Sequence, residues 1–546
     1  MSAPVAVSAF ASPNGPPEPG DPGPTGYRWS RLPGSVRGAV AVAAVMVVWE
    51  VVGRLELVGD GAFPSLSGVL RRLWQDRDDY PRHVVATVRS ASMGFVIGTA
   101  IAIVCALIFA RFSIIERLLR GVGVTLFAVP LIAVVPVLLI AFSGDTPRIV
   151  LAAMAVYYPT MVATLHGLRT VDGRLVDLVV ASGGGELSVM RFVRLRSALP
   201  SILAGLRTAA PAALLGALLV EFGGGVRWGL GSYLLGSLGR AVPERIWGIG
   251  LVATAIAALA YALFSALGTR SGRLAQGPTT ATSLGESERA ESLGRRIILG
   301  AASGGIVLGL WALAVRALDV SPIVVKSPLG VARYLLTGVR GEAARARLVD
   351  ALGQTLPVAL LGLACGLAAA LILALITTLS PSLGRALLPF ALISQTMPLP
   401  ALTPIIVLVF GRGTWAIIAV TVSVTFFPSF VTIAQGLQTA PTGPVSVVSS
   451  YGGGPVTALR FVALPNAVGY LVTAARLAAP RALLGVMIAE YLSTGTGIGN
   501  LVNEARGRLE YGMIWSVAAV AVIVGVLLTA AVAQVERLVW RRLGRR

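Results

Sequence analysis

Residues 129–142 read VPLIAVVPVLLIAF, and residues 397–410 read MPLPALTPIIVLVF. Each stretch is almost wholly apolar and carries prolines at the same two places, so that Pro130 and Pro136 correspond to Pro398 and Pro404. Apolar runs of this kind are typical of helices inside a lipid bilayer. The correspondence predicts that the chain contains two copies of one membrane-embedded module.

The likeness between the two halves extends well beyond these stretches. Trp49 and Trp311 lie in similar first helices, and the offset between matched positions drifts only from about 262 to about 269 residues. Further matches are MGFVIGTAIA (93–102) with LGLACGLAAA (361–370), and ERIWGIG (244–250) with YGMIWSV (511–517). Because the register is kept over such a length, we interpret the chain as a tandem duplication.

The composition indicates a membrane protein. Of 546 residues, 55% are hydrophobic and only 13% are charged, against about 25% charged in soluble domains. About twelve apolar runs approach the length that crosses a bilayer. They must be helices, because lipid offers no hydrogen-bond partner and the backbone groups have to bond to one another. We expect an all-α polytopic protein whose two repeats run parallel, since an even number of spans returns each copy to its starting side. The runs fall near 38–53, 84–110, 119–142, 148–168, 201–222 and 246–268, then near 296–318, 353–379, 385–411, 414–437, 470–491 and 513–535.

Arginine placement predicts the orientation in the cell membrane. The net charge of +20 would suggest nucleic acid in a soluble protein, but arginines beside membrane helices hold loops in the cytoplasm and contact lipid headgroups. They gather before the first helix, between the second and third, and between the fourth and fifth. We therefore expect both termini in the cytoplasm and no nucleic-acid partner. The opposite loops, 54–83 and 319–352, mix acids such as Asp76 with basic residues, as solvated amphipathic helices do.

Composition also predicts the domain boundaries. Residues 1–35 are rich in Pro, Gly and Ser and are expected to form a disordered cytoplasmic tail. Residues 269–295 are polar and are expected to be a flexible linker. The two membrane-spanning domains would then be 36–268, with a cytoplasmic loop at 169–200, and 296–546, with the equivalent loop at 438–469.

Residues that could carry chemistry are sparse. Cys105 and Cys365 lie in apolar runs without a CxxC partner, and His83 and His166 are isolated, so the sequence predicts no metal site. No convincing Walker A motif occurs. We expect no catalytic residue and no cofactor bound by this chain.

A glycine triplet marks both cytoplasmic loops. Residues 182–200 read SGGGELSVMRFVRLRSALP, and residues 450–465 read SYGGGPVTALRFVALP. No Lys-Ser/Thr follows either triplet, which argues against a phosphate-binding loop. Glycine instead permits backbone angles closed to other residues, so that one short helix can end and another begin at a sharp angle. Val189, Phe192, Val193 and Leu195 would offer apolar contacts to a partner; packing against the bundle's own underside is the alternative.

This pattern resembles the inner-membrane permeases of binding-protein-dependent ABC importers of type I. Their cytoplasmic signature has an acidic residue, a glycine and a Leu-Pro pair, matched here by Asp177, Gly183 and Leu199-Pro200. The second copy has Ser446 at the acid position but keeps the glycine and the Leu-Pro pair. Segments such as GLRTAAPAALLGALLVEF (205–222) resemble the nitrate, sulfonate and taurine subgroup.

The resemblance implies a division of labour between chains. A cytoplasmic ATPase dimer would dock on the two loops and use ATP and Mg, so that this chain is not an enzyme. An extracytoplasmic binding protein would deliver a small solute such as a sulfonate, nitrate, taurine or a vitamin precursor, and the chain would act as a fused dimer of permeases. The coupling residues implied are Asp177, Gly183, Gly184, Gly185, Arg191, Phe192, Leu199, Pro200, Tyr451, Gly452, Gly453, Gly454, Arg460, Phe461, Leu464 and Pro465.

Residues for the translocation pathway are harder to choose. The four repeat-related prolines can bend helices and suit a gate, or they are static kinks used for packing. Glu221 and Glu490 lie near the outer end of the fifth helix of each copy, where we favour a structural hydrogen bond or a binding-protein contact over substrate contact. Arg207 and Arg476, near its inner end, are interpreted as snorkelling to the interface.

Two other functions fit the sequence less well. A twelve-helix secondary transporter also has parallel halves, but it would carry charges deep in its helices, whereas the helix centres here read as nearly charge-free. A membrane enzyme would need a cluster of His, Asp or Ser that the isolated histidines do not supply.

Overall fold

The computed structural model describes residues 34–57, 61–224, 226–240, 242–270, 293–317, 321–380, 384 and 398–542. Within these ranges the regular structure is helical throughout. Residues 1–33 of the predicted tail and most of the predicted linker lie outside the described residues, and the last two residues of the predicted tail already belong to the first helix. At the linker's edges the flanking helices continue, ending at Arg270 and beginning at Leu293.

The first repeat contains helices of very different lengths. Its membrane-length helices and their connectors are α1 (Gly34–Arg54), α2 (Leu66–Gln75), α3 (Tyr80–Arg111), α4 (Ser113–Ala128), α5 (Leu131–Ala141), α6 (Thr146–Arg169), α7 (Gly173–Ala181), α8 (Glu186–Ser188), the π-helical turn η3 (Val189–Arg194), α9 (Leu195–Phe222), α10 (Leu230–Leu238) and α11 (Pro243–Arg270).

The second repeat follows the same order. Its described elements are α13 (Leu293–Ala317), α14 (Pro328–Leu336), α15 (Gly341–Leu379), α17 (Leu399–Phe410), α18 (Thr414–Gln438), α19 (Thr442–Ser450), α20 (Pro455–Ala458), the π-helical turn η4 (Leu459–Ala463), α21 (Leu464–Ala489), the π-helical turn η5 (Glu490–Thr494), α22 (Gly497–Gly507) and α23 (Tyr511–Arg542).

Nine of the described helices are long and apolar enough to cross a membrane, and a tenth span arises if the bent pair α4–α5 is one crossing. The predicted run 119–142 is therefore not one straight helix: its chain turns by 95° between α4 and α5. Pro130 causes the break because it lacks the amide that would continue the ladder of α4. Two predicted spans are described only in part. For the span 38–53 the side chains up to residue 42 lie outside the description, and for the span 385–411 residues 385–397 do.

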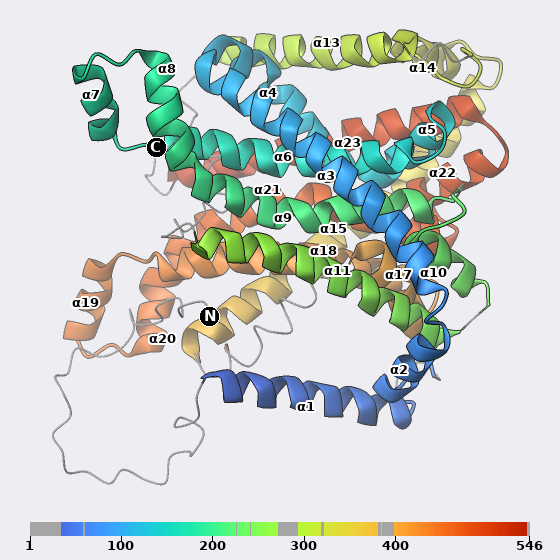
Figure 1. Ribbon diagram of the computed structural model, residues 1–546, viewed down its shortest axis with the longest axis horizontal. Helices are drawn as coiled ribbons and strands as arrows, with labels where there is room; N and C mark the ends of the chain where they lie inside the picture. The colour runs from blue at the N-terminus through green and yellow to red at the C-terminus, as the bar shows by residue number, and fades with distance from the viewer. Residues whose placement is uncertain are drawn as a thin grey trace.

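The helices form a bundle whose two ends differ (Figure 1). The short helices α7, α8, α19 and α20 project at one end, and α2, α10, α14 and α22 lie at the other. Within each repeat, glycines allow close packing: a Cβ on Gly94 of α3 would lie 2.5 Å from the Ala152 Cβ of α6, and one on Gly362 of α15 would lie 2.6 Å from Thr421 Cγ2 of α18. Small residues let membrane helices approach in this way.

The two repeats share one core. Helix α11 of the first contacts α17 of the second, while α23 of the second contacts α4 and α5 of the first. The largest apolar cluster draws on both, including Ile132 of α5, Leu219 of α9 and Leu483 of α21. Such pairing is what two-fold-related copies of one module produce. The fold is thus a single fused unit whose seam runs between the repeats.

A tryptophan pair confirms the alignment of the first and last spans of each repeat. The Trp49 indole donates to Pro64 O (3.0 Å) and its ring lies 5.1 Å from that of Trp247. In the second repeat, Trp311 donates to Lys326 O (3.2 Å) and stacks 5.7 Å from Trp515. The loops next to them contain the expected amphipathic helices α2 and α14.

One acid of these loops is not solvated as predicted. Asp76 is only 8% exposed. Arg245 of α11 donates to it from Nε (2.6 Å) and Nη2 (2.8 Å), and Arg72 donates from Nε (2.9 Å). The sequence placed Asp76 among solvated charges because its partner lies 169 residues away.

Candidate functional site

The two glycine loops, residues 169–200 and 438–469, have one backbone design. Helix α7 ends at Ala181, after which Gly183 N–H bonds to Val180 O (3.0 Å) and Gly184 N–H to Val179 O (2.8 Å). In the second loop, Gly452 N–H bonds to Ser449 O (3.0 Å) and Gly453 N–H to Val448 O (2.9 Å). These bonds satisfy the last carbonyls of α7 and α19, as glycine-ended helices commonly do.

Glycine is required at the first two positions of each triplet for two different physical reasons. Gly183 and Gly452 adopt φ of +81° and +76°, a region that other residues enter only with strain. At Gly184 a Cβ would lie 2.5 Å from Val179 Cγ1, and at Gly453 2.5 Å from Val448 Cγ1. Gly185 and Gly454 have ordinary negative φ, and a Cβ there would meet nothing within 4 Å. The sharp change of direction predicted from the triplets is present in both loops.

A π-helical turn follows each hinge. It spans η3 in the first loop and η4 in the second, and it runs directly into α9 or α21. Each turn carries an Arg-Phe pair whose guanidinium carbon lies 5.5 Å from the ring centroid, namely Arg191 with Phe192 and Arg460 with Phe461. The recurrence shows that both turns present the same exposed Arg-Phe pair.

Exposure separates the residues that a partner could touch from those that it could not. Phe192 is 51% exposed and Phe461 65%. Val189 and Val193 are only 5% and 7% exposed, so our expectation that they offer contacts to a partner was wrong. Both valines belong to η3, which packs against α6 and α9.

The remaining loop residues surround the hinge. Most are exposed: Asp177, Leu199, Tyr451 and Pro465, with Pro200 and Leu464 half-buried at the first turns of α9 and α21. The loops differ in charge, because the first contains Asp172, Arg174, Asp177 and Glu186 where the second has uncharged residues. Glu186 also pairs with Arg111 at 2.8 Å. The shared backbone thus carries two different surfaces.

The repeat-related prolines lie at the seam between the repeats. Pro136 and Pro404 are buried inside α5 and α17, while Pro130 and Pro398 precede these helices as their N-caps. Both α5 and α17 contact α9 and α21. Their role in gating stays a prediction.

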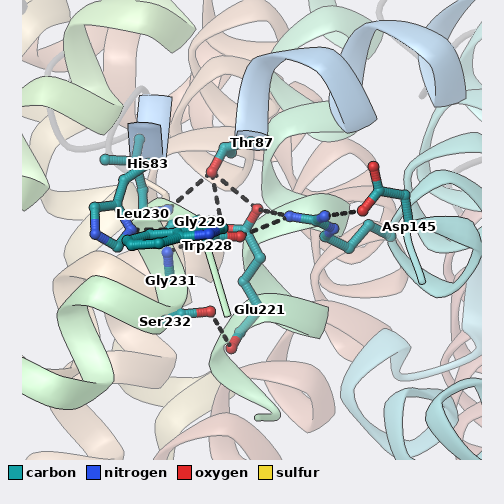
Figure 2. A network of polar contacts seen from close by, with 10 residues as sticks. His83, Thr87, Asp145, Glu221, Trp228, Gly229, Leu230, Gly231 and Ser232 are labelled. Carbon is teal, nitrogen blue, oxygen red and sulfur yellow. Dashed lines mark hydrogen bonds and ion pairs between the residues drawn. The ribbon is translucent and has the colours of Figure 1, made fainter. Parts of the chain in front are cut away.

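The two glutamates occupy built hydrogen-bond sites at the opposite end of the bundle from the loops. Glu221 is fully buried, and Figure 2 shows its carboxylate facing Thr87. The Thr87 hydroxyl donates to the carboxylate (2.9 Å), and Gly231 N–H donates to Oε2 (2.9 Å). Leu230 N–H in turn donates to Thr87 Oγ1 (2.9 Å), which fixes the start of α10.

The second repeat contains the same arrangement. Glu490 is 2% exposed and accepts from the Thr355 hydroxyl (2.8 Å) and from Gly499 N–H (2.9 Å). Ile498 N–H donates to Thr355 Oγ1 (2.9 Å). A Cβ on Gly229 or Gly497 would collide with the glutamate of its own repeat. The structural hydrogen bond that we favoured for these residues is therefore present in both copies.

The surroundings of the two carboxylates are not symmetric. Arg148 Nη1 donates to Glu221 Oε1 (3.3 Å) and to Trp228 O (2.9 Å), and Asp145 pairs with the same guanidinium. Counted from the matched contacts of Ala152 and Thr421, the equivalent position in α18 is Ile417, and among the described residues no basic side chain forms an ion pair with Glu490. Within the described ranges, Glu221 has a countercharge and Glu490 does not.

The inner arginines also differ. Arg476 pairs with Glu536 of α23 (2.9 Å), which is 6% exposed, whereas Arg207 lies over the Tyr261 ring at 5.2 Å. Arg476 is thus held by an ion pair, whereas we expected its side chain to extend to the membrane interface. The sequence reasoning missed Thr87, Thr355 and Arg148; aligning the repeats would have paired the two threonines.

The comparisons with known proteins agree with this geometry. The family model described as "Binding-protein-dependent transport system inner membrane component" matches residues 98–276 and again 354–545. A probable ABC transporter permease protein of Haemophilus influenzae is 26% identical over 40% of this chain and 90% of its own length. The formylaminopyrimidine transport permease protein of Halalkalibacterium halodurans is 25% identical over 43% of this chain and 93% of its own.

A third relative, the putative aliphatic sulfonates transport permease protein of Bacillus subtilis, is 25% identical over 37% of this chain and 72% of its own length. Each of these relatives therefore aligns with less than half of this chain. With the family model matched twice, over more than half of the residues, this chain belongs to the binding-protein-dependent transport system inner membrane components, and it contains two such domains in one multi-pass membrane protein.

Proposed function

We propose that this chain is the complete transmembrane unit of an ATP-driven importer, coupled to a separate cytoplasmic ATPase dimer through the two glycine loops. The observation that carries the proposal is the equivalence of these loops. Each has a left-handed glycine hinge and an exposed Arg-Phe pair, and both project from the same end of the bundle (Figure 1). A two-fold partner needs two such handles on one side.

The surfaces of the loops support a docking role. Large apolar side chains of both loops are exposed to solvent, including Leu187 at 87% and Tyr451 at 89%. Clustered exposed apolar groups mark interaction sites. The elements facing away from the bundle, α7 and α19, contain no buried side chain. They therefore contribute little to the core and are free to contact another chain.

Substrate would enter from the opposite end. The elements there are α2, α10, α14 and α22, which would meet an extracytoplasmic binding protein. The named relatives transport formylaminopyrimidine and, putatively, aliphatic sulfonates. We propose a small solute of this size range for this chain, with the loops and both termini in the cytoplasm.

Copurification and cross-linking test this proposal. Cys105 and Cys365 are first replaced by alanine, and Leu187→Cys or Tyr451→Cys is then introduced. We expect an ABC ATPase to copurify with the chain from its native membrane and to cross-link through both cysteines. A cysteine at Leu57, exposed beyond the end of α1, is the control and should not cross-link. Uptake driven by an ion gradient with no ATPase attached would instead support the twelve-helix secondary transporter.

A further inference from the structure

Arg481 lies deep in the membrane-spanning part of α21, where sequence reasoning expected no charge. About 13 Å of helix separates it from the buried Glu490 at the outer end, at about 1.5 Å per residue. Burying a charge at this depth is costly, and such residues are usually paired or line a polar cavity. Arg481 therefore needs an explanation.

Two other arginines inside the described membrane-spanning helices are held by ion pairs, but Arg481 is not. Arg148 is held by Asp145 and Glu221, and Arg476 by Glu536. No carboxylate, carbonyl or hydroxyl in the described part of the protein forms a hydrogen bond or ion pair with Arg481. The side chain is half-buried, so its charge is neither satisfied by the protein nor fully solvated.

Its position on α21 places it at the seam between the repeats. Helical spacing puts Arg481 in one stripe with Leu484, Ile488 and Tyr491. Leu484 and Ile488 belong to the apolar cluster that both repeats share. The Tyr491 hydroxyl donates to Gly223 O at the end of α9 in the first repeat (3.3 Å). The stripe that carries Arg481 thus faces the other repeat.

The equivalent stripe on α9 has no charge. Pro211 matches Pro480, so Ala212 is the counterpart of Arg481, and Leu215 is the counterpart of Leu484. Ala212 is half-buried, and Leu215 packs against the same shared cluster. A charge needed only for packing would be expected in both copies, because the helices around it are equivalent. The fused chain instead places one cation on one side of the seam.

We propose that Arg481 binds an anionic group of the transported solute, a carboxylate or sulfonate, at the seam between the repeats. This rests on the proposed function, because it assumes that the seam is the translocation pathway. The planar guanidinium fork matches two oxyanion oxygens, which a lysine ammonium does not do. A single cation at one side of the seam would then hold one anion per transport cycle.

The test uses the full chain in nanodiscs, with ethanesulfonate as the probe. Anything that binds only the folded state raises its melting temperature. We expect 50 mM ethanesulfonate, compared with chloride at equal ionic strength, to raise the Tm of the wild type by about 2 °C. Arg481→Gln should abolish the shift while raising the Tm without probe, because it removes an unpaired charge from the half-buried seam. The exposed Arg412→Gln is the control and should keep the shift.

A second variant, in which the arginine is moved to the other repeat, separates loss of binding from a folding defect. Arg481→Gln combined with Ala212→Arg moves the cation to the two-fold-related position and should restore the ethanesulfonate shift. An unchanged shift in Arg481→Gln, or no shift in the wild type, overturns the inference. Neither result affects copurification of an ATPase, whose absence would refute the proposed function alone.

Discussion

Gly183 and Gly452 share a left-handed backbone conformation, with φ of +81° and +76°, at the same point of two loops in separate repeats. The hinge fixes the direction in which each short helix, α7 or α19, leaves the end of the bundle. A side chain at either glycine would strain the hinge without touching the core, since a Cβ there meets nothing within 4 Å.

The double substitution Gly183→Val and Gly452→Val should uncouple ATP hydrolysis from uptake. A β-branched residue at positive φ costs about 1–2 kcal/mol, which the loop can relieve by swinging the short helix away. We expect transport to fall at least tenfold while the chain still inserts and purifies. Uptake and ATPase rates in proteoliposomes measure both effects.

The matched control for this experiment is Gly185→Val with Gly454→Val. These glycines have φ of −81° and −80° and open space around Cβ, so valine fits without strain. The control should retain transport. Unchanged uptake in the Gly183→Val, Gly452→Val protein would show that the hinges have no role in coupling.

The two buried glutamates should respond differently to neutralisation. Glu221→Gln leaves the buried Arg148 without a full countercharge, whereas Glu490 has no ion-pair partner among the described residues. Breaking a buried charged pair costs more than removing a neutral hydrogen bond. We expect Glu221→Gln to lower the free energy of unfolding by about 2 kcal/mol more than Glu490→Gln. Thermal unfolding in nanodiscs measures the difference, and equal Tm values would contradict it.

The ion pair between Asp76 and Arg245 should make part of the stability depend on pH. Burial alone would raise the pKa of Asp76, but hydrogen bonds and charge from Arg245 and Arg72 outweigh it and hold the pKa below its usual value. The carboxylate therefore stabilises the fold above the unfolded-state pKa of about 3.9. That contribution is lost as the pH falls through the lower, folded-state pKa.

The measurement compares the wild type with Asp76→Asn. We expect the variant to be about 2 kcal/mol less stable at pH 7. The gap should narrow as the pH is lowered from about 4 and the wild-type carboxylate becomes protonated. A gap that stays constant down to pH 2 would mean that Asp76 acts through packing.

Much of the fold follows from the sequence because lipid imposes simple rules. Apolar length predicts the spans, and the internal match between 129–142 and 397–410 predicts the duplication. The glycine hinges were also predictable, because three consecutive glycines recur at the same place in both loops and glycine permits the backbone angles of a sharp turn. What the pattern hid was the break at Pro130, because an apolar run does not show whether its two halves are collinear.

The contacts that sequence reasoning missed join distant residues or break the repeat symmetry. Thr87 meets Glu221 across 134 residues, and Arg245 meets Asp76 across 169. Arg148 matches Ile417 and Arg481 matches Ala212, so alignment of the repeats gives no support for either. Such asymmetric residues are where a fused chain can differ from a pair of identical subunits.

The most direct test of the account asks which side of the membrane the two loops occupy. In a Cys105→Ala, Cys365→Ala background, Leu187→Cys and Tyr451→Cys are labelled with an impermeant maleimide in sealed right-side-out and inside-out vesicles. The account predicts that both cysteines react only in inside-out vesicles, where the cytoplasmic face is accessible. Labelling of the two cysteines from opposite sides would contradict the parallel arrangement and the docking of one ATPase dimer.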